Sequence, residues 1–255
     1  MTDLLQLQGI SRSFGGIVAL NQVSLRVPQG TVYGVIGPNG AGKTTLFNII
    51  TGFYYEDSGT RTFNGEVLPS RWPPHKLTRL GIARTFQNIR LFGQMNVLDN
   101  VLVGRYIHAR SSVLASLLRT RAFIEDERAQ REYAMTMLRK VKLDHRASDL
   151  AVSLSYGDQR RLEIARALAT EPRLLALDEP AAGMNAQESR ALSDLLAQLR
   201  QEGLTLLLIE HDMSLVSGIC DRIAVLDFGQ VIVEGDPETV RHHPQVIAAY
   251  LGGSA

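Results

Sequence analysis

The pattern of hydrophobic and polar positions changes twice along the chain. Residues 4–10 and 17–27 have the pattern of strands, and the turn Pro28-Gln29-Gly30 separates them from a β-branched run at 31–36. Asn64-Gly65 stands between two short strand-like segments, and this dipeptide is a strong signal for a tight hairpin. The first part of the chain is therefore predicted to combine an antiparallel patch with a core strand.

The middle of the chain has no convincing strand pattern. Asn96 is a candidate N-cap, and from there to about Leu143 only helix-compatible segments occur, such as residues 125–140. We therefore expect a helical insert in this region.

Strands and helices alternate again after the insert, as in an α/β fold with a largely parallel sheet. Ser155, with Asp158 three residues later, fits the N-terminal capping pattern of a helix. Leucines at 192, 195, 196 and 199 repeat with helical spacing. The expected strands are 173–177, 204–209, 222–226 and 230–234, and residues 245–251 are expected to form a last helical turn or two.

Composition and charge exclude several classes of protein. Of the 255 residues 45% are hydrophobic and 21% are charged, which excludes a disordered chain, a collagen-like repeat and a disulfide scaffold. Lysine and arginine number 27 against 26 aspartates and glutamates, so the formal net charge is +1. Because strong binding to a nucleic-acid duplex needs many basic contacts, we expect no nucleic-acid partner.

No targeting or membrane-spanning segment is expected. The start of the chain, Met1 to Leu5, lacks a basic region followed by an apolar core, and the densest apolar run, 204–209, includes Thr205. The single cysteine, Cys220, follows an apolar stretch and is expected to be a buried side chain. A chain of this kind would work at a membrane only by docking onto a protein that spans it.

A glycine-rich segment between a predicted strand and a predicted helix has the pattern G-x-x-x-x-G-K-[ST]. Its glycines let backbone N–H groups surround a phosphate chain, the lysine adds a positive charge on the β and γ oxygens, and the hydroxyl after the lysine suits Mg²⁺. The segment therefore predicts a nucleotide triphosphate site. Its residues are Gly37, Pro38, Asn39, Gly40, Ala41, Gly42, Lys43 and Thr44.

A second segment supplies the acidic half of such a site. The apolar run 174–177 ends in Asp178 and Glu179, of which Asp178 suits Mg²⁺ by way of water and Glu179 suits the polarisation of an attacking water. None of the four lysines follows an asparagine, so the guanine-reading pattern N-K-x-D is absent and ATP is the expected nucleotide.

A third motif carries a family resemblance. Residues 154–161, Leu-Ser-Tyr-Gly-Asp-Gln-Arg-Arg, look like the signature motif of ABC transporter ATPases and precede Asp178-Glu179 at the family's spacing. Gln87 resembles the family's loop glutamine, His211 its switch histidine, and Phe14 the aromatic residue that stacks on adenine. The resemblance extends from about Leu4 to Glu234.

The resemblance implies a P-loop NTPase (RecA-like) core with an antiparallel β subdomain and an α-helical subdomain. Residues 1–86 and 160–235 would form the core with its β subdomain. Residues 87–159 would form the helical subdomain, with an insert at about 106–132, and residues 236–255 a C-terminal helical tail.

The resemblance also implies a mechanism that needs two subunits. Family members close head to tail, so that Ser155 and the backbone at Gly157 of one subunit would meet the γ-phosphate held by the other subunit's glycine loop, residues 37–45, which includes Thr45. Glu179, His211 and Gln87 would be catalytic, and Thr44, Gln87 and Asp178 would ligate Mg²⁺. Gln87 would relay the nucleotide state to the helical insert, which docks transmembrane permease subunits.

Three positions depart from the family pattern. Tyr156 stands where the family often has glycine, Asp158 where it often has glutamine, and Asn185 where a dimer-contact loop commonly has aspartate. A neutral asparagine still forms hydrogen bonds but offers no anionic acceptor. These departures bear on the coupling between two nucleotide sites rather than on the ATP site itself.

The transported solute is indicated by softer motifs. Residues 84–92, the segment 106–132 and the tail 246–252 look like the ATPase subunit of branched-chain amino acid importers, the longer of two different ATPase subunits. Such a subunit would lie on the cytoplasmic side of the cell (inner) membrane as a peripheral protein and would act indirectly with a substrate-binding protein. Lipopolysaccharide exporters, urea or amide importers, non-transport ABC ATPases and an inactive nucleotide-binding scaffold are the alternatives.

The predicted insert is basic. Between Arg105 and Lys142 there are nine lysines and arginines against four acidic residues, a local charge of +5 (9 − 4). A solvated helix face is the favoured interpretation, and contact with lipid headgroups or a partner is the alternative.

Overall fold

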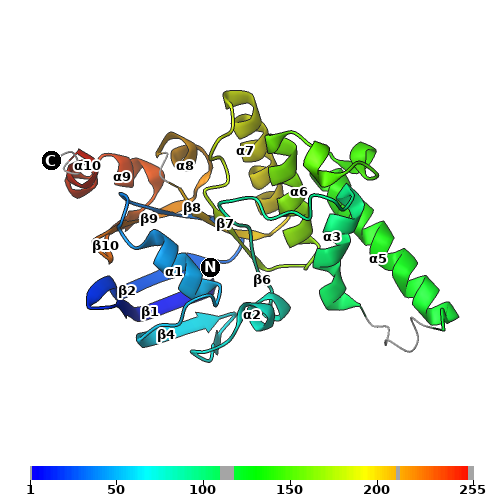
Figure 1. Ribbon diagram of the computed structural model, residues 1–255. Coiled ribbons are helices and arrows are strands. Elements are labelled where there is room, and N and C mark those ends of the chain that lie inside the picture. Colours follow the sequence, from blue (N-terminus) through cyan, green and yellow to red (C-terminus); the bar gives the residue numbers. More distant parts are fainter. Residues whose placement is uncertain (1, 110–117, 211–212, 252–255) are drawn as a thin grey trace.

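A mainly parallel sheet forms the centre of the molecule in the computed structural model, which describes residues 2–109, 118–210 and 213–251 (Figure 1). Its strand order is β10-β9-β3-β8-β7-β6, and the strands are parallel except for β10 at one edge. The strands are β3 (Val32–Ile36), β6 (Ile82–Arg84), β7 (Leu174–Asp178), β8 (Thr205–Ile209), β9 (Arg222–Asp227) and β10 (Gln230–Gly235). The predicted α/β fold is confirmed.

A second, antiparallel sheet has the order β2-β1-β4-β5. It consists of β1 (Asp3–Phe14), β2 (Ile17–Pro28), β4 (Ser58–Phe63) and β5 (Glu66–Val67). The predicted hairpin at Asn64-Gly65 is confirmed, with both residues at positive φ, 52° and 84°, as a two-residue I′ turn requires.

The two faces of the central sheet bury different partners. In β3, Tyr33 and Val35 point into one apolar cluster, which includes α1 (Lys43–Ile50) and the antiparallel sheet, while Val32 and Ile36 point into the other. The second cluster contains α6 (Tyr156–Leu168), α7 (Ala186–Gln201) and α8 (Met213–Ile219). Side chains that alternate along a strand thus place α1 and α6 on opposite faces of the sheet.

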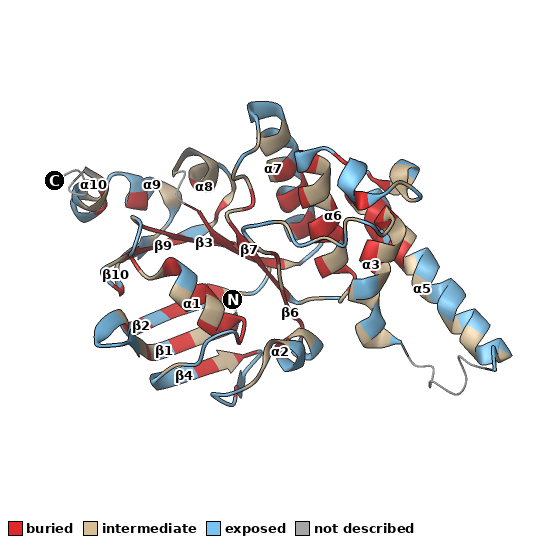
Figure 2. Cartoon of the chain, in the orientation of Figure 1, coloured by how far each residue is buried: buried red, intermediate tan, exposed pale blue. Residues whose placement is uncertain are grey.

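The middle of the chain is helical, as expected. Asn96 caps α3 (Val97–Arg105) by accepting a hydrogen bond from the Asp99 N–H, and Thr120 caps α5 (Arg121–Lys140), which begins four residues before the predicted segment. Figure 1 shows α3 and α5 at the end of the molecule opposite α10, and Figure 2 shows that much of α5 is exposed. Short 3₁₀ turns are η1 (Tyr106–His108), η2 (Asp144–Arg146) and η3 (Ala151–Ser153).

The division into domains stays a prediction. Side chains of α3, α5 and α6 share one buried cluster with the central sheet. Part of the predicted insert, residues 110–117, lies outside the described residues.

The remaining elements include one strand that the sequence did not indicate. β6 has only three residues and is too short to show a period. The other elements are α2 (Pro74–Leu80), α9 (Pro237–Arg241) and α10 (Pro244–Leu251). Cys220 is buried, as predicted. In the part of the chain that the structure describes, no helix is both long and apolar enough to cross a membrane.

Candidate functional site

The predicted site residues follow the carboxyl ends of neighbouring parallel strands. The glycine loop follows β3, and Gln87 comes three residues after β6. Strand β7 ends at Asp178, and Glu179 is the next residue. Parallel strands end at the same edge of a sheet, which is where ligands bind in open α/β folds. His211 comes two residues after β8 and lies outside the described residues.

The shape of the glycine loop is fixed by close backbone contacts. Gly37, with φ 150°, approaches β9 so closely that a Cβ would lie 2.1 Å from the carbonyl oxygen of Leu226. Gly42, with φ 101°, approaches β2, where a Cβ would lie 2.6 Å from the carbonyl oxygen of Ala19. Glycine is therefore required at both positions by sterics as well as by conformation.

The loop ends at a helix N-terminus that no side chain caps. Gly42 occupies the N-cap position of α1 without a side-chain hydrogen bond, so the first N–H groups of α1 are free of side-chain acceptors. Thr44 and Thr45 lie in this first turn, with Thr44 exposed and Thr45 half-buried. Such a helix start favours an anion.

Lys43 lies folded against its own loop. Its Nζ donates to the carbonyl oxygens of Gly37 at 2.7 Å and Pro38 at 2.8 Å, and the side chain is buried. Burial lowers the pKa of Lys43, while the charge of Glu179 acts in the opposite direction. The Glu179 carboxylate therefore lies close enough to the Lys43 ammonium group to affect its pKa.

The acidic pair at the end of β7 points to two different partners. Glu179 Oε2 accepts a hydrogen bond from Gln87 Nε2 at 2.9 Å, so the structure brings these two predicted residues together. Asp178 Oδ2 lies 3.1 Å from Arg84 Nη2. Burial raises the pKa of Asp178, and the Arg84 charge opposes this shift. Glu179 has a left-handed backbone, φ 43°, which is unusual for a residue with a side chain and is common at functional sites.

Arg84 is a site residue that sequence reasoning missed. Its guanidinium donates to Asn48 Oδ1 at 2.6 Å and Thr51 Oγ1 at 3.0 Å, so it connects α1 to the Asp178 carboxylate. The guanidinium carbon also lies 4.6, 4.9 and 5.0 Å from the ring centres of Phe47, Phe53 and Phe86. A single arginine at the end of a three-residue strand gives no pattern from which this role could be inferred.

Phe14 lies at the end of β1, beside the hairpin that joins β1 to β2. Its ring meets the Tyr54 ring edge-on at 5.2 Å, and the Arg12 guanidinium stands 4.7 Å from its centre. Phe14 is 37% exposed, and Ala19 of the same hairpin contacts the glycine loop at Gly42. The structure thus leaves Phe14 available for a ring contact with a ligand.

Ser155 and Gly157 lie on the other face of the sheet from α1. Ser155 caps α6, its exposed Oγ accepting a hydrogen bond from the Asp158 N–H at 3.2 Å. Gly157 is buried against Glu188, whose Oε1 would lie 2.8 Å from an added Cβ. Within one chain, therefore, these two residues do not belong to the group formed by the glycine loop, Gln87 and Glu179.

Each of the three unusual residues has a structural partner. Asn185 caps α7 and forms a reciprocal capping box with Glu188, which fixes Glu188 beside the signature segment. Asp158 pairs with Arg161 in the first turn of α6, where a negative charge is favourable. The Tyr156 hydroxyl accepts a hydrogen bond from Arg160 at 3.3 Å.

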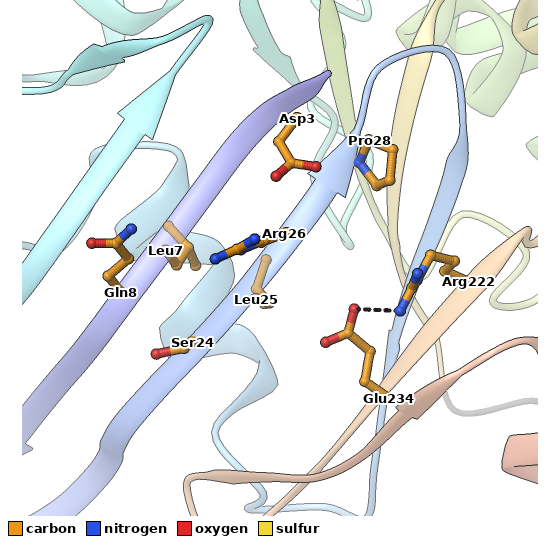
Figure 3. A pocket seen from close by; sticks show the side chains of 9 residues that line it. All are labelled: Asp3, Leu7, Gln8, Ser24, Leu25, Arg26, Pro28, Arg222 and Glu234. Atoms are coloured by element: carbon orange, nitrogen blue, oxygen red, sulfur yellow. Dashed lines mark ion pairs between the residues drawn. The ribbon is translucent and has the colours of Figure 1, made fainter. Parts of the chain in front are cut away.

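Among the described residues, Ser155 and Gly157 help to line a small hollow of about 140 Å³, and larger hollows lie elsewhere. One of about 570 Å³ lies beside the glycine loop and is bounded by the β9–β10 turn and α10. It is lined by Pro38, Asn39, Gly40, Ala41, Asp227, Phe228, Ile232, Gln245, Ala248 and Ala249. A polar hollow of about 630 Å³ is lined by β1, β2, β9 and β10, where Arg222 pairs with Glu234 at 3.3 Å (Figure 3). None of the predicted site residues lines this polar hollow of about 630 Å³, so we do not assign it to the site.

Comparison with known families gives two matches. The family described as "ABC transporter" matches residues 20–182. The family described as "Branched-chain amino acid ATP-binding cassette transporter" matches residues 230–255, the segment that contains β10, α9 and α10. The second match therefore includes four of the residues that line the hollow beside the glycine loop, namely Ile232, Gln245, Ala248 and Ala249.

Curated relatives match over nearly the whole chain. The chain is 48% identical over 250 residues to the high-affinity branched-chain amino acid transport ATP-binding protein BraF of Pseudomonas aeruginosa, with 98% of each chain covered. It is 44% identical over 250 residues to LivG of Escherichia coli, which has the same description, again with 98% of each chain covered.

Solved structures also resemble this chain over most of its length. An ATP-binding cassette of an ABC transporter in its ADP conformation matches with a TM-score of 0.87 at 36% identity, covering 99% of this chain and 100% of that one. A dimeric structure of a bacterial ABC transporter cassette matches with a TM-score of 0.76 at 26% identity, covering 91% of this chain and 98% of the other.

Proposed function

Because this chain belongs to the ABC transporter ATP-binding family, we propose that it hydrolyses ATP to power the import of branched-chain or other hydrophobic amino acids. The observation that carries the proposal is the group at one edge of the sheet, where an uncapped helix start with its glycine loop lies beside the hydrogen-bonded pair Gln87 and Glu179. The solute class is supported by the similarity to BraF and LivG.

The glycine loop is the proposed ATP-binding element. Its backbone N–H groups and the N-terminus of α1 suit the phosphate chain, and Phe14 suits the adenine ring. Lys43 already lies at the loop and would exchange its two carbonyl acceptors for phosphate oxygens. The ATP-contacting residues proposed are Phe14, Gly37, Pro38, Asn39, Gly40, Ala41, Gly42, Lys43, Thr44 and Thr45.

The same edge fits a Mg²⁺ ion bound together with the triphosphate. Among the described residues no three His, Cys, Asp or Glu side chains form a metal site by themselves, which suits a cation that takes most of its ligands from phosphate and water. Thr44, Gln87 and Asp178 would hold it, and when bound it would neutralise charge on the β and γ oxygens. Asp178 would then exchange its ion pair with Arg84 for the cation.

Glu179 is the proposed general base. Its carboxylate is oriented by the Gln87 amide and is close enough to Lys43 to influence its pKa. An oriented carboxylate polarises the attacking water and accepts its proton. We propose that His211, which follows β8, assists at the γ-phosphate.

Ser155 and Gly157 are proposed to complete the site of a second, homologous subunit. Because α6 lies on the opposite face from α1, the Ser155 hydroxyl and the start of α6 are available to a triphosphate held by another chain. Contacts made only with a γ-phosphate favour the ATP-bound pair over the ADP-bound pair, which links hydrolysis to opening of the dimer.

We further propose that the chain binds transmembrane permease subunits on the cytoplasmic side of the inner membrane and acts indirectly with a substrate-binding protein. The experiment is to isolate the tagged chain from membranes with its partners, reconstitute the complex in vesicles and measure ATP-driven uptake of labelled leucine, isoleucine and valine. Uptake that is abolished by Glu179→Gln supports the proposal. Uptake of urea alone, export of lipopolysaccharide, or ATPase activity with no membrane partner contradicts it.

A further inference from the structure

Two charged side chains of α6 are buried at its contact with the Gln87 segment, residues 86–90. Arg160 is 0% exposed and Glu163 is 1% exposed, and they pair at 3.0 Å between Nη1 and Oε2. They are one helical turn apart, on the side of α6 that faces the chain after β6. Buried charges are costly unless they are paired and hydrogen-bonded, so the partners of this pair are informative. Arg160 Nε is buried without a hydrogen bond, whereas both Nη atoms and both Glu163 oxygens have partners.

The pair holds the backbone on both sides of Gln87. Arg160 Nη1 donates to the carbonyl oxygen of Phe86 at 2.5 Å, and its Nη2 donates to the carbonyl oxygen of Gln87 at 2.8 Å. Glu163 Oε1 accepts hydrogen bonds from the N–H groups of Phe86 at 3.3 Å and Arg90 at 3.4 Å. Four backbone groups of the segment are thus bound by two side chains of one helix.

Gln87 and Ser155, which lie at the two ends of this network of contacts, both have roles in the proposed mechanism. The Gln87 side chain reaches Glu179 at the end of β7, while the helix that holds the Gln87 backbone begins at Ser155. Arg160 also donates to the Tyr156 hydroxyl at 3.3 Å in the first turn of α6. Arg160 therefore connects the Gln87 segment directly to the first turn of α6.

Stability alone does not explain a buried ion pair. Replacing such a pair by apolar side chains of similar volume is often neutral or stabilising, and in some proteins a buried polar group instead fixes one arrangement of the groups around it. Here the groups are the backbone atoms that orient the Gln87 side chain.

We propose that Arg160 and Glu163 are positioning residues that lock the Gln87 segment to α6, so that Gln87 and the Ser155 end of the helix move as one body when ATP binds. The proposal rests on the proposed function, because it takes the glycine loop as the ATP site. It assigns to two residues within the signature helix a role that requires no contact with ATP.

The test uses the full chain with the double substitution Arg160→Met/Glu163→Leu, which removes both charges of the pair together. Arg166 Nη2, which lies 3.8 Å from Glu163 Oε1, also loses a contact in this variant, so Arg166→Met alone is measured beside it. We expect ATP affinity within about twofold of wild type, and kcat lower by about tenfold with an unchanged KM, as is typical when a coupling residue is lost. Amide hydrogen exchange of residues 86–90 without nucleotide should become about tenfold faster.

The matched control is Arg161→Met, on the same helix, because Arg161 binds Asp158 and the carbonyl oxygen of Val141 instead of the Gln87 segment. This variant should keep wild-type exchange at 86–90. Arg160→Lys provides a conservative variant that folds with its charge intact, and it should retain part of kcat because an ammonium group reaches fewer of the acceptors than a guanidinium.

Three results overturn the proposal: wild-type kcat and exchange in the double variant, an equal loss in Arg161→Met, or a fall in kcat that is matched by a fall in ATP affinity. Failure of the part of the proposed function on which this rests, the ATP site at the glycine loop, is distinguishable, because wild-type protein would then bind no ATP. In that case the exchange of residues 86–90 without nucleotide still decides whether the pair holds the segment.

Discussion

The glycine loop and the Gln87 segment lie at the same edge of the sheet but are held in different ways. The glycine loop is fixed by van der Waals contact of Gly37 and Gly42 with the backbone of β9 and β2. The Gln87 segment is held by hydrogen bonds from two buried charged side chains of α6. The first set of contacts joins the glycine loop to strands of the two sheets, whereas the second joins the Gln87 segment to a helix.

This difference separates a preformed binding element from a responsive one. A phosphate cradle benefits from a shape that does not change when the ligand arrives, because no free energy is then spent on ordering it. A segment that reports the presence of the γ-phosphate needs two accessible arrangements of similar free energy. Glu179 lies between the two, with the glycine loop on one side and Gln87 on the other.

The largest expected effect is at this meeting point. Glu179→Gln should lower kcat by roughly 10² to 10⁴ because the general base is lost, while ATP binding remains. The measurement is steady-state ATP hydrolysis together with equilibrium ATP binding. Glu202→Gln, at the far end of α7, is the control and should keep wild-type turnover. Near-normal turnover of Glu179→Gln would overturn the assignment of the base.

The next largest effect is expected from a substitution that tests whether close packing fixes the shape of the glycine loop. Gly42→Ala should lower the free energy of unfolding by about 3 kcal/mol, from overpacking against Ala19 and from the left-handed backbone. Gly40→Ala is the matched control, because its φ is also positive, 82°, but an added Cβ there meets nothing within 4 Å. Urea denaturation without nucleotide compares the two. Equal destabilisation would mean that backbone conformation, and not packing, fixes the loop.

Lys43→Ala should act on affinity rather than on shape. Loss of one charged hydrogen-bonding group removes about 1.5–3 kcal/mol, so the dissociation constant for ATP should rise roughly 10- to 150-fold. Titration calorimetry measures this change, and Lys76→Ala on α2 is the surface control. Micromolar affinity that survives the Lys43 substitution would contradict the proposed phosphate contact.

The comparison also explains which parts of the fold and of the candidate site the sequence alone could indicate. The glycine loop, Asp178 and Glu179 could be found because glycine spacing and the apolar run before the acids reflect local backbone requirements. The ends of most central strands and the caps of α3 and α6 were predicted for the same reason, because periodicity and capping residues are local signals.

Residues that act through tertiary contacts could not be predicted in this way. Arg84, Arg160 and Glu163 acquire their partners only when segments distant in sequence pack together, as in the bond from Arg160 to Phe86 across 74 positions. Arg160 and Glu163 stand on either side of Leu162 in the sequence of a predicted helix. Such a charged pair cannot be told from a solvated pair until the buried face of the helix is known. The three-residue strand β6 was missed because it carries no periodic pattern.

The smallest effect concerns the polar contacts around the signature segment. Asn185→Ala should lower the free energy of unfolding by about 1 kcal/mol, because the cap of α7 and its bond to the Glu188 N–H are lost. Asn185→Asp should preserve stability, since aspartate caps a helix equally well and its charge suits the helix N-terminus. Thermal unfolding of both variants provides the measurement. An equal loss of stability in Asn185→Asp and Asn185→Ala would mean that the cap does not account for the effect. The asparagine amide itself would then be the group that holds Glu188 beside Gly157.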